Sequence, residues 1–105
     1  MKILAASSEQ YPPHWLVCVG RDKQIYAYLE ETHKFHYSHP LDMDYFWDME
    51  LNYAEISADT AVELINQGIG QQKEISEWGR ERLVNSDLFL TPDEVLGEAT
   101  RNLLR

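Results

Sequence analysis

The spacing of apolar residues changes along the chain, from a period of two in the first half to helical spacing in the second half. Residues 14–20, 25–30 and 35–38 are short apolar or aromatic runs between polar turns, which is typical of β-strands. Later segments begin with helix-capping residues. This order predicts an α+β fold: an antiparallel sheet of about four to five strands in the N-terminal half, covered on one face by two to three C-terminal helices.

The strand-like runs can be placed by their turns. Residues 14–20 follow two prolines and are joined to residues 25–30 by the polar tetrapeptide RDKQ, which predicts a β-hairpin. Residues 35–38 predict a third strand, and Pro40 should end it because proline cannot donate a hydrogen bond to a sheet. The first ten residues contain only a short apolar run, so we expect them to be loosely held.

Three C-terminal segments predict helices. Ser57 is a suitable N-cap for a helix over residues 58–68, and residues 71–85 repeat apolar side chains at helical spacing. Thr91 and Glu94 have the spacing of a capping box, with a proline at the first helical position between them. The apolar face of this last helix is expected to consist of Val95, Leu96, Ala99, Leu103 and Leu104.

Between these halves, residues 41–53 read LDMDYFWDMELNY, with an apolar or aromatic residue at every odd position and mostly acidic residues at even positions. A period of two favours strands, so we predict one strand over residues 43–48, a turn at Asn52 and another strand over residues 53–56. A short helix over residues 43–49 is the alternative, because one helical face would then hold Met43, Phe46 and Trp47.

Length and cysteine content limit the class of protein. A chain of 105 residues can bury a core without disulfides, so we expect one globular domain over residues 1–105. The single cysteine, Cys18, permits no internal disulfide and fits a reducing compartment. The first apolar run is too short for a signal peptide, and no segment approaches the ~20 apolar residues of a membrane span. These features predict a cytoplasmic protein.

The negative charge is concentrated in one region. The formal net charge is −9, and the chain between Lys34 and Lys73 holds seven acids and no Lys or Arg. A field of this sign repels nucleic acids and anionic membranes and attracts basic proteins. An acidic surface can also serve only to keep a small protein soluble.

Candidate residues for catalysis or metal binding form no known motif. His33, His36 and His39 are imidazole ligands close to acids, but on a strand a spacing of three alternates between the two faces. Cys18 lies in an apolar run, where a buried, unreactive thiol is expected. We therefore expect no cofactor, no metal and no enzymatic activity. A small metal-dependent enzyme that uses the three histidines is the alternative.

The acidic stretch suggests a function. If its odd positions pack inward, a strand over residues 43–48 presents carboxylates outward every ~6.6–7 Å, with one aromatic among them. Charge would steer a basic partner and the aromatic would anchor it. Small acidic immunity proteins, antitoxins and anti-defence inhibitors of nucleases, toxins or nucleic-acid-binding proteins use such surfaces. A non-inhibitory scaffold or a homodimer is the alternative. The expected partner-binding residues are Asp42, Asp44, Phe46, Asp48 and Glu50.

Overall fold

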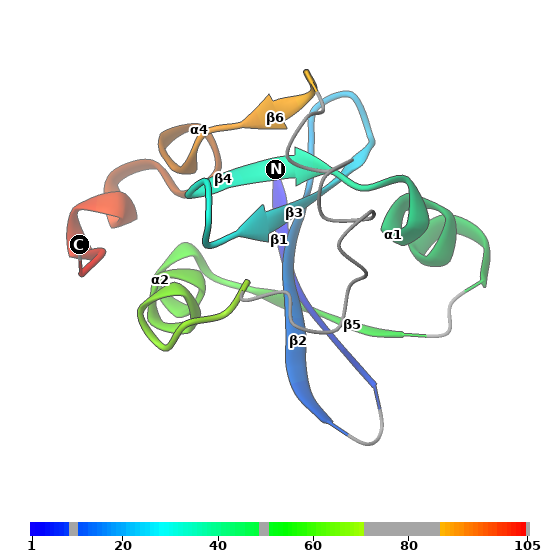
Figure 1. The fold of residues 1–105 in the computed structure, drawn as a ribbon, viewed down its shortest axis with the longest axis horizontal. Coiled ribbons are helices and arrows are strands. Elements are labelled where there is room, and N and C mark those ends of the chain that lie inside the picture. Colours follow the sequence, from blue (N-terminus) through cyan, green and yellow to red (C-terminus); the bar gives the residue numbers. More distant parts are fainter. Residues whose placement is uncertain (9–10, 49–50, 71–86, 105) are drawn as a thin grey trace.

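A six-stranded antiparallel sheet forms the centre of the molecule (Figure 1). The computed structural model describes residues 1–8, 11–48, 51–70 and 87–104. The order of the strands across the sheet is β5-β1-β2-β3-β4-β6. Their bounds are β1 (Lys2–Ser8), β2 (Tyr11–Val19), β3 (Ile25–Leu29), β4 (Lys34–Tyr37), β5 (Asn52–Ile56) and β6 (Phe89–Leu90).

Short helices pack against this sheet, and α2 and α4 begin at the residues that the sequence marks as caps. Ser57 caps α2 (Ala58–Asn66) through a hydrogen bond that its hydroxyl accepts from the N–H of Thr60. Thr91 and Glu94 form the expected capping box. The remaining helical segments are α1 (His39–Met43), the π-helical turn η1 (Asp44–Asp48), α4 (Pro92–Leu96) and the 3₁₀ segment η2 (Gly97–Asn102). The predicted α+β class is confirmed.

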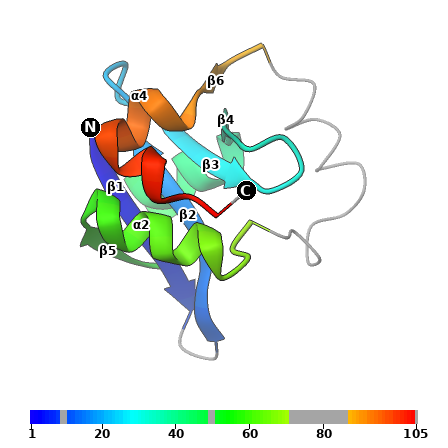
Figure 2. The same cartoon turned by 90° about the vertical axis from the view of Figure 1, so that its left-hand side faces the viewer.

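One face of the sheet is covered by α2, α4 and η2 (Figure 2). Its core includes fully buried residues from three neighbouring strands, and partly buried apolar residues of all three helical segments pack against them. We call this side the α2 face. The buried strand residues on it include Leu16, Cys18, Tyr28 and Phe35.

The opposite face is covered by α1 and η1, and we call it the α1 face (Figure 1). Leu41 of α1 is buried against a second cluster of strand residues, and Tyr45 of η1 is partly buried beside it. All five residues of β3 are buried, because this central strand is covered on both sides. The buried strand residues on the α1 face include Leu4, Val17, Ile25 and Ala27.

The start of the chain differs from the expectation of a loose terminus. β1 pairs with β2 on one side and β5 on the other, so it lies inside the sheet. It forms a hairpin with β2 and also pairs with the distant β5, and a short apolar run does not reveal the second pairing. β2 starts at Tyr11 and includes both prolines; the pairing with β1 shifts register between Ala6 and Ser8, and an irregular pairing tolerates proline.

The predicted strand over residues 43–48 is wrong. Residue 43 ends α1, and residues 44–48 form η1. β4 ends at Tyr37, Ser38 caps α1 and Pro40 lies in its first turn, so the proline expected to end a strand belongs to the start of a helix. The alternative helix over residues 43–49 was closer.

Of the other expectations for the second half, some are confirmed, one is wrong in part and one is untested. The strand predicted over residues 53–56 is present as β5. The last helical segment is divided at Gly97, which has a φ of +60°, and Leu104 is 81% exposed instead of packed. The predicted helix over residues 71–85 lies outside the described residues.

Candidate functional site

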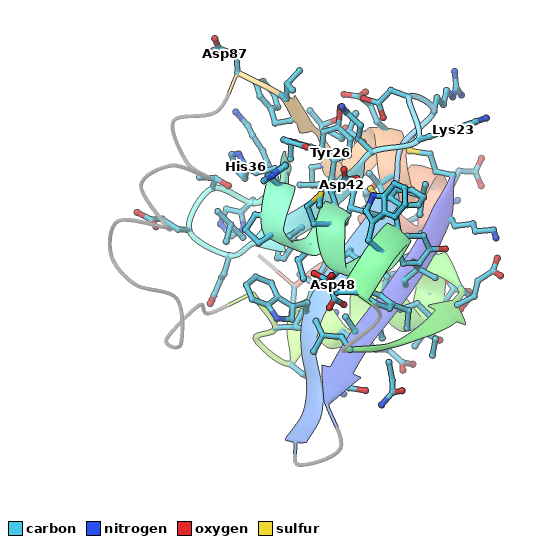
Figure 3. All side chains as sticks on the ribbon, turned by 90° about the vertical axis from the view of Figure 1, so that its right-hand side faces the viewer. Lys23, Tyr26, His36, Asp42, Asp48 and Asp87 are labelled. Carbon is cyan, nitrogen blue, oxygen red and sulfur yellow. The ribbon has the colours of Figure 1, made fainter. Side chains whose placement is uncertain are left out.

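Asp42, in the acidic stretch, makes a hydrogen bond that holds α1 against the sheet. Its Oδ1 accepts a hydrogen bond of 3.1 Å from the backbone N–H of Ile25, at the start of β3. A carboxylate bound to a backbone N–H is a strong, charge-assisted acceptor. Asp42 therefore attaches α1 to the sheet, and one of its two oxygens is already used. Figure 3 shows its position on the α1 face.

Asp44 of η1 connects this turn to β5 through hydrogen bonds. Its Oδ2 accepts hydrogen bonds from the hydroxyl of Tyr53 at 2.7 Å and from the N–H of Leu51 at 3.2 Å. The pKa of Tyr53 is raised, first by burial and then by this hydrogen bond to Asp44. The phenol therefore keeps its proton and remains a donor. Asp44 contributes negative charge to the region, but its contacts are structural.

Three aromatic rings in contact lead from Tyr53 to the surface. The ring of Tyr45 meets the rings of Phe46 and Tyr53 edge to face, with centroid distances of 4.9 and 5.0 Å. Edge-to-face pairs are favourable beyond the area they bury. The inner ring, Tyr45, is partly buried, and Phe46 lies outside it. The chain in η1 is therefore held in place by its neighbours, although it carries exposed apolar groups.

Three large apolar side chains are exposed on α1 and η1. Trp47 is 75% exposed, Phe46 45% and Met43 40%. Asp48, also exposed, follows them directly at the end of η1 (Figure 3). We call Met43, Phe46, Trp47 and Asp48 the η1 patch. Its apolar members are the three that the alternative helix would place on one face.

The expected binding residues thus fall into two groups, exposed side chains and side chains that are hydrogen-bonded within the protein. Phe46 and Asp48 are exposed, as the acidic-ladder prediction requires. Asp42 and Asp44 bind inside the protein, so the predicted ladder of outward carboxylates is wrong. The helical geometry also reverses the expected inward direction of two other residues, Met43 and Trp47. Glu50 lies outside the described residues.

A groove of about 630 Å³ lies beside the η1 patch, between η1 and the β5 edge of the sheet. Its aromatic walls form no sequence motif, although Tyr45 and Tyr53 are both odd-position residues of the alternating stretch over residues 41–53. Charged groups at the groove come from Lys2 and Glu55. The other lining residues are Leu4, Tyr45, Phe46, Leu51, Asn52 and Tyr53.

The three histidines have separate environments. His33 is in the left-handed conformation, with a φ of +57°, and its Nδ1 lies 3.3 Å from the Tyr28 hydroxyl. His36 is 3% exposed, its Nε2 lies 2.6 Å from the Thr32 hydroxyl, and its buried Nδ1 has no hydrogen-bond partner among the residues that the structure describes. His39 is exposed at the start of α1. No group of three potential metal ligands occurs in the part of the chain that the structure describes.

Cys18 is fully buried in β2, as its apolar neighbours predict. Burial raises the pKa of its thiol to about 12. The thiolate is the nucleophilic form, so a neutral thiol at this position is unreactive. This finding agrees with the expectation that Cys18 has a structural role.

Among the described residues, no helix is long and apolar enough to cross a membrane. Comparison of the chain with protein-family models, with curated proteins and with solved structures gives no match.

Proposed function

We propose that this chain is a small acidic protein-binding module of the inhibitor, immunity or antitoxin type. Its target is a basic surface of a partner protein, such as a nuclease, a toxin or a nucleic-acid-binding protein. The observation that carries the proposal is the η1 patch, where exposed aromatic side chains lie in the most acidic region of the chain. The buried single cysteine supports the cytoplasm as its location.

The aromatic part of the patch supplies the anchor. Tryptophan and other aromatic residues dominate the binding energy of protein interfaces when a partner pocket removes them from water. Trp47 has the largest exposed fraction of the patch and follows an aromatic residue that is itself packed on Tyr45. Phe46, held by its contact with Tyr45, should therefore lose less conformational entropy on binding than an unsupported side chain.

The charge supplies the direction of approach. Asp42 and Asp44 accept internal hydrogen bonds, so they belong to the acidic region without being placed to contact a partner directly. Asp48 and Glu55 are exposed and can meet basic groups directly. Interactions of this kind increase the association rate more than the final affinity, and salt weakens them.

The alternatives make different use of the same surface. In a scaffold or solubility role the charge has no specific partner. In a homodimer the apolar side chains of the η1 patch would meet their copies, but two chains of net charge −9 would then come together. A basic partner removes this repulsion, which favours the inhibitor interpretation.

Affinity capture from a lysate of the native host or of its competitors tests the proposal at low and high salt. We expect a basic protein to be retained at low salt, to be released by high salt or by added DNA, and to have an activity that the chain inhibits. Trp47→Ala should abolish capture, and Leu104→Ala is the matched control because Leu104 is 81% exposed and lies outside the patch.

Charge reversal provides a second pair of variants. Asp48→Lys and Asp87→Lys change the net charge equally, and both side chains are exposed. We expect Asp48→Lys to reduce capture by at least roughly tenfold and Asp87→Lys to have a small effect, because Asp48 adjoins the anchor. No retained protein, or equal retention by Trp47→Ala, would show that the surface is not a binding site for a basic partner.

A further inference from the structure

The two edges of the sheet differ in how they are protected from further pairing. β6 has two residues, Phe89 and Leu90, and the ammonium of Lys34 lies 4.5 Å from the centroid of the Phe89 ring. Short edge strands and lysines are common devices that stop additional strands from joining a sheet. This edge is therefore closed to strand addition.

β5 forms the other edge and lacks these devices. It has five residues, contains no lysine or proline, and pairs on one side with β1 (Figure 2). Alternate residues of an edge strand direct their N–H and C=O groups away from the sheet. Within the described residues, no backbone hydrogen bond of residues 52–56 other than those to β1 is present. The outer side of β5 can therefore accept another strand.

The groove lies beside this open edge. Glu55 pairs with Leu4, and Tyr53 pairs with Ala6, so both side chains of β5 are on the α1 face, where the groove lies. Side chains of a strand project alternately to the two faces. Every second side chain of a strand added to β5 would thus be directed toward the rim that Phe46 and Tyr53 form.

We infer that β5 and the adjoining groove bind an extended, lysine- or arginine-bearing segment of a partner protein, which joins the sheet as a seventh strand. Main-chain hydrogen bonds to an edge, together with side chains in neighbouring pockets, are an established mode of peptide recognition. This inference rests on the proposed function for the class of partner and adds the part of the partner that is bound.

Charge selects this occupant over a second copy of the chain. The groove has Glu55 beside it, and Asp48 is exposed at the end of the adjacent η1; Lys2 is the only base among the described lining residues. A symmetric β5 dimer centred on Ala54 would pair each Glu55 with a Tyr53 and place the two Glu55 residues as diagonal neighbours, about 7–8 Å apart. A basic segment instead neutralises this charge.

Hydrogen exchange on the full chain tests the inference. The probe is a blocked peptide of about eight residues in which lysine alternates with valine and threonine, the length of an ordinary strand. We expect the amides of β5 that do not bond to β1 to become protected when the peptide is added. A peptide that alternates lysine with proline has the same charge but cannot form a ladder, and should give no protection.

Variants distinguish the contribution of charge near β5 from that of main-chain pairing with its edge. Glu55→Lys should weaken binding of the lysine peptide by roughly tenfold at low salt, and Asp87→Lys, with the same change of net charge, by much less. Unchanged exchange in residues 52–56 at saturating peptide would overturn the inference. So would equal protection by the lysine–proline peptide, or a dimer in sedimentation that already protects β5.

The result can be distinguished from failure of the proposed function. If Trp47→Ala abolishes capture of a basic partner but the peptide leaves β5 unchanged, the proposed function stands and strand addition is wrong. If the peptide protects every second amide of β5 but no basic partner is captured through Trp47, strand addition stands and the proposed function is wrong.

Discussion

The two faces of the sheet are built by different means. On the α2 face, capped helices cover large side chains such as Tyr28 and Phe35, which are almost completely buried. On the α1 face, carboxylates of Asp42 and Asp44 hold a short helix and a π-helical turn, and aromatic side chains remain exposed beside them. The α2 face is stabilised by apolar packing. On the α1 face, hydrogen bonds hold the helical segments in place, and a surface with exposed aromatic side chains remains available for contact.

The largest expected effect is on the α2 face. Leu16 is fully buried there, so Leu16→Ala should lower the free energy of unfolding by about 2–5 kcal/mol through lost burial and a residual cavity. Denaturant unfolding measures this change. Trp47→Ala, although it removes a larger side chain, should change stability by less than about 0.5 kcal/mol because Trp47 is mostly exposed. Equal losses would contradict the division between the faces.

A smaller effect on stability is expected from removing the hydrogen bonds of Asp44 on the α1 face. Asp44→Ala should lower the free energy of unfolding by about 1–3 kcal/mol, because the Tyr53 hydroxyl and the Leu51 N–H lose their acceptor. It should also lower the pKa of Tyr53, which a spectrophotometric titration can follow. Asp48→Ala removes an exposed carboxylate of the same stretch and serves as the control. If both variants are equally stable, Asp44 does not hold η1.

The smallest effect concerns pH and His36, which lies on the α1 face opposite Ala27. Burial, and to a lesser extent Lys34, lower the pKa of His36 below 6.5. The unfolded chain therefore binds this proton first as the pH falls, so stability should decrease below about pH 6.5 and be unaffected by His36 above it. Unfolding of the native chain and His36→Gln across this range measures the difference. Identical pH slopes would refute it.

The α2 face could be anticipated from sequence because its signals are local. Ser57, Thr91 and Glu94 mark helix starts within a few residues, and the apolar spacing identifies which side of each helix packs. The alternation of the first strands likewise indicates a hairpin. By contrast, β1 lies between β2, the next strand of the chain, and the distant β5, and the pairing with β5 is not encoded in a short apolar run.

The α1 face was harder to anticipate because two periods fit residues 41–53. The strict alternation of acids and apolar residues favoured a strand, whereas Ser38 and Pro40 already contained a helix-start signal like that of Thr91 and Pro92. The error changed which side chains face outward. Phe46 and Asp48 were placed correctly at the surface, but no sequence pattern shows that Asp44 would bind Tyr53, since that contact depends on how the chain returns to the sheet.

The buried position of Cys18 gives the molecule a chemical reporter of its own opening. The thiol is the single one in the sequence and lies in β2, with its side chain in the core of the α2 face. A thiol reagent can label it only in molecules in which this core has opened, so the labelling rate measures the population of those molecules. A ligand that binds the closed form should slow this labelling, and binding could therefore be followed without any added tag.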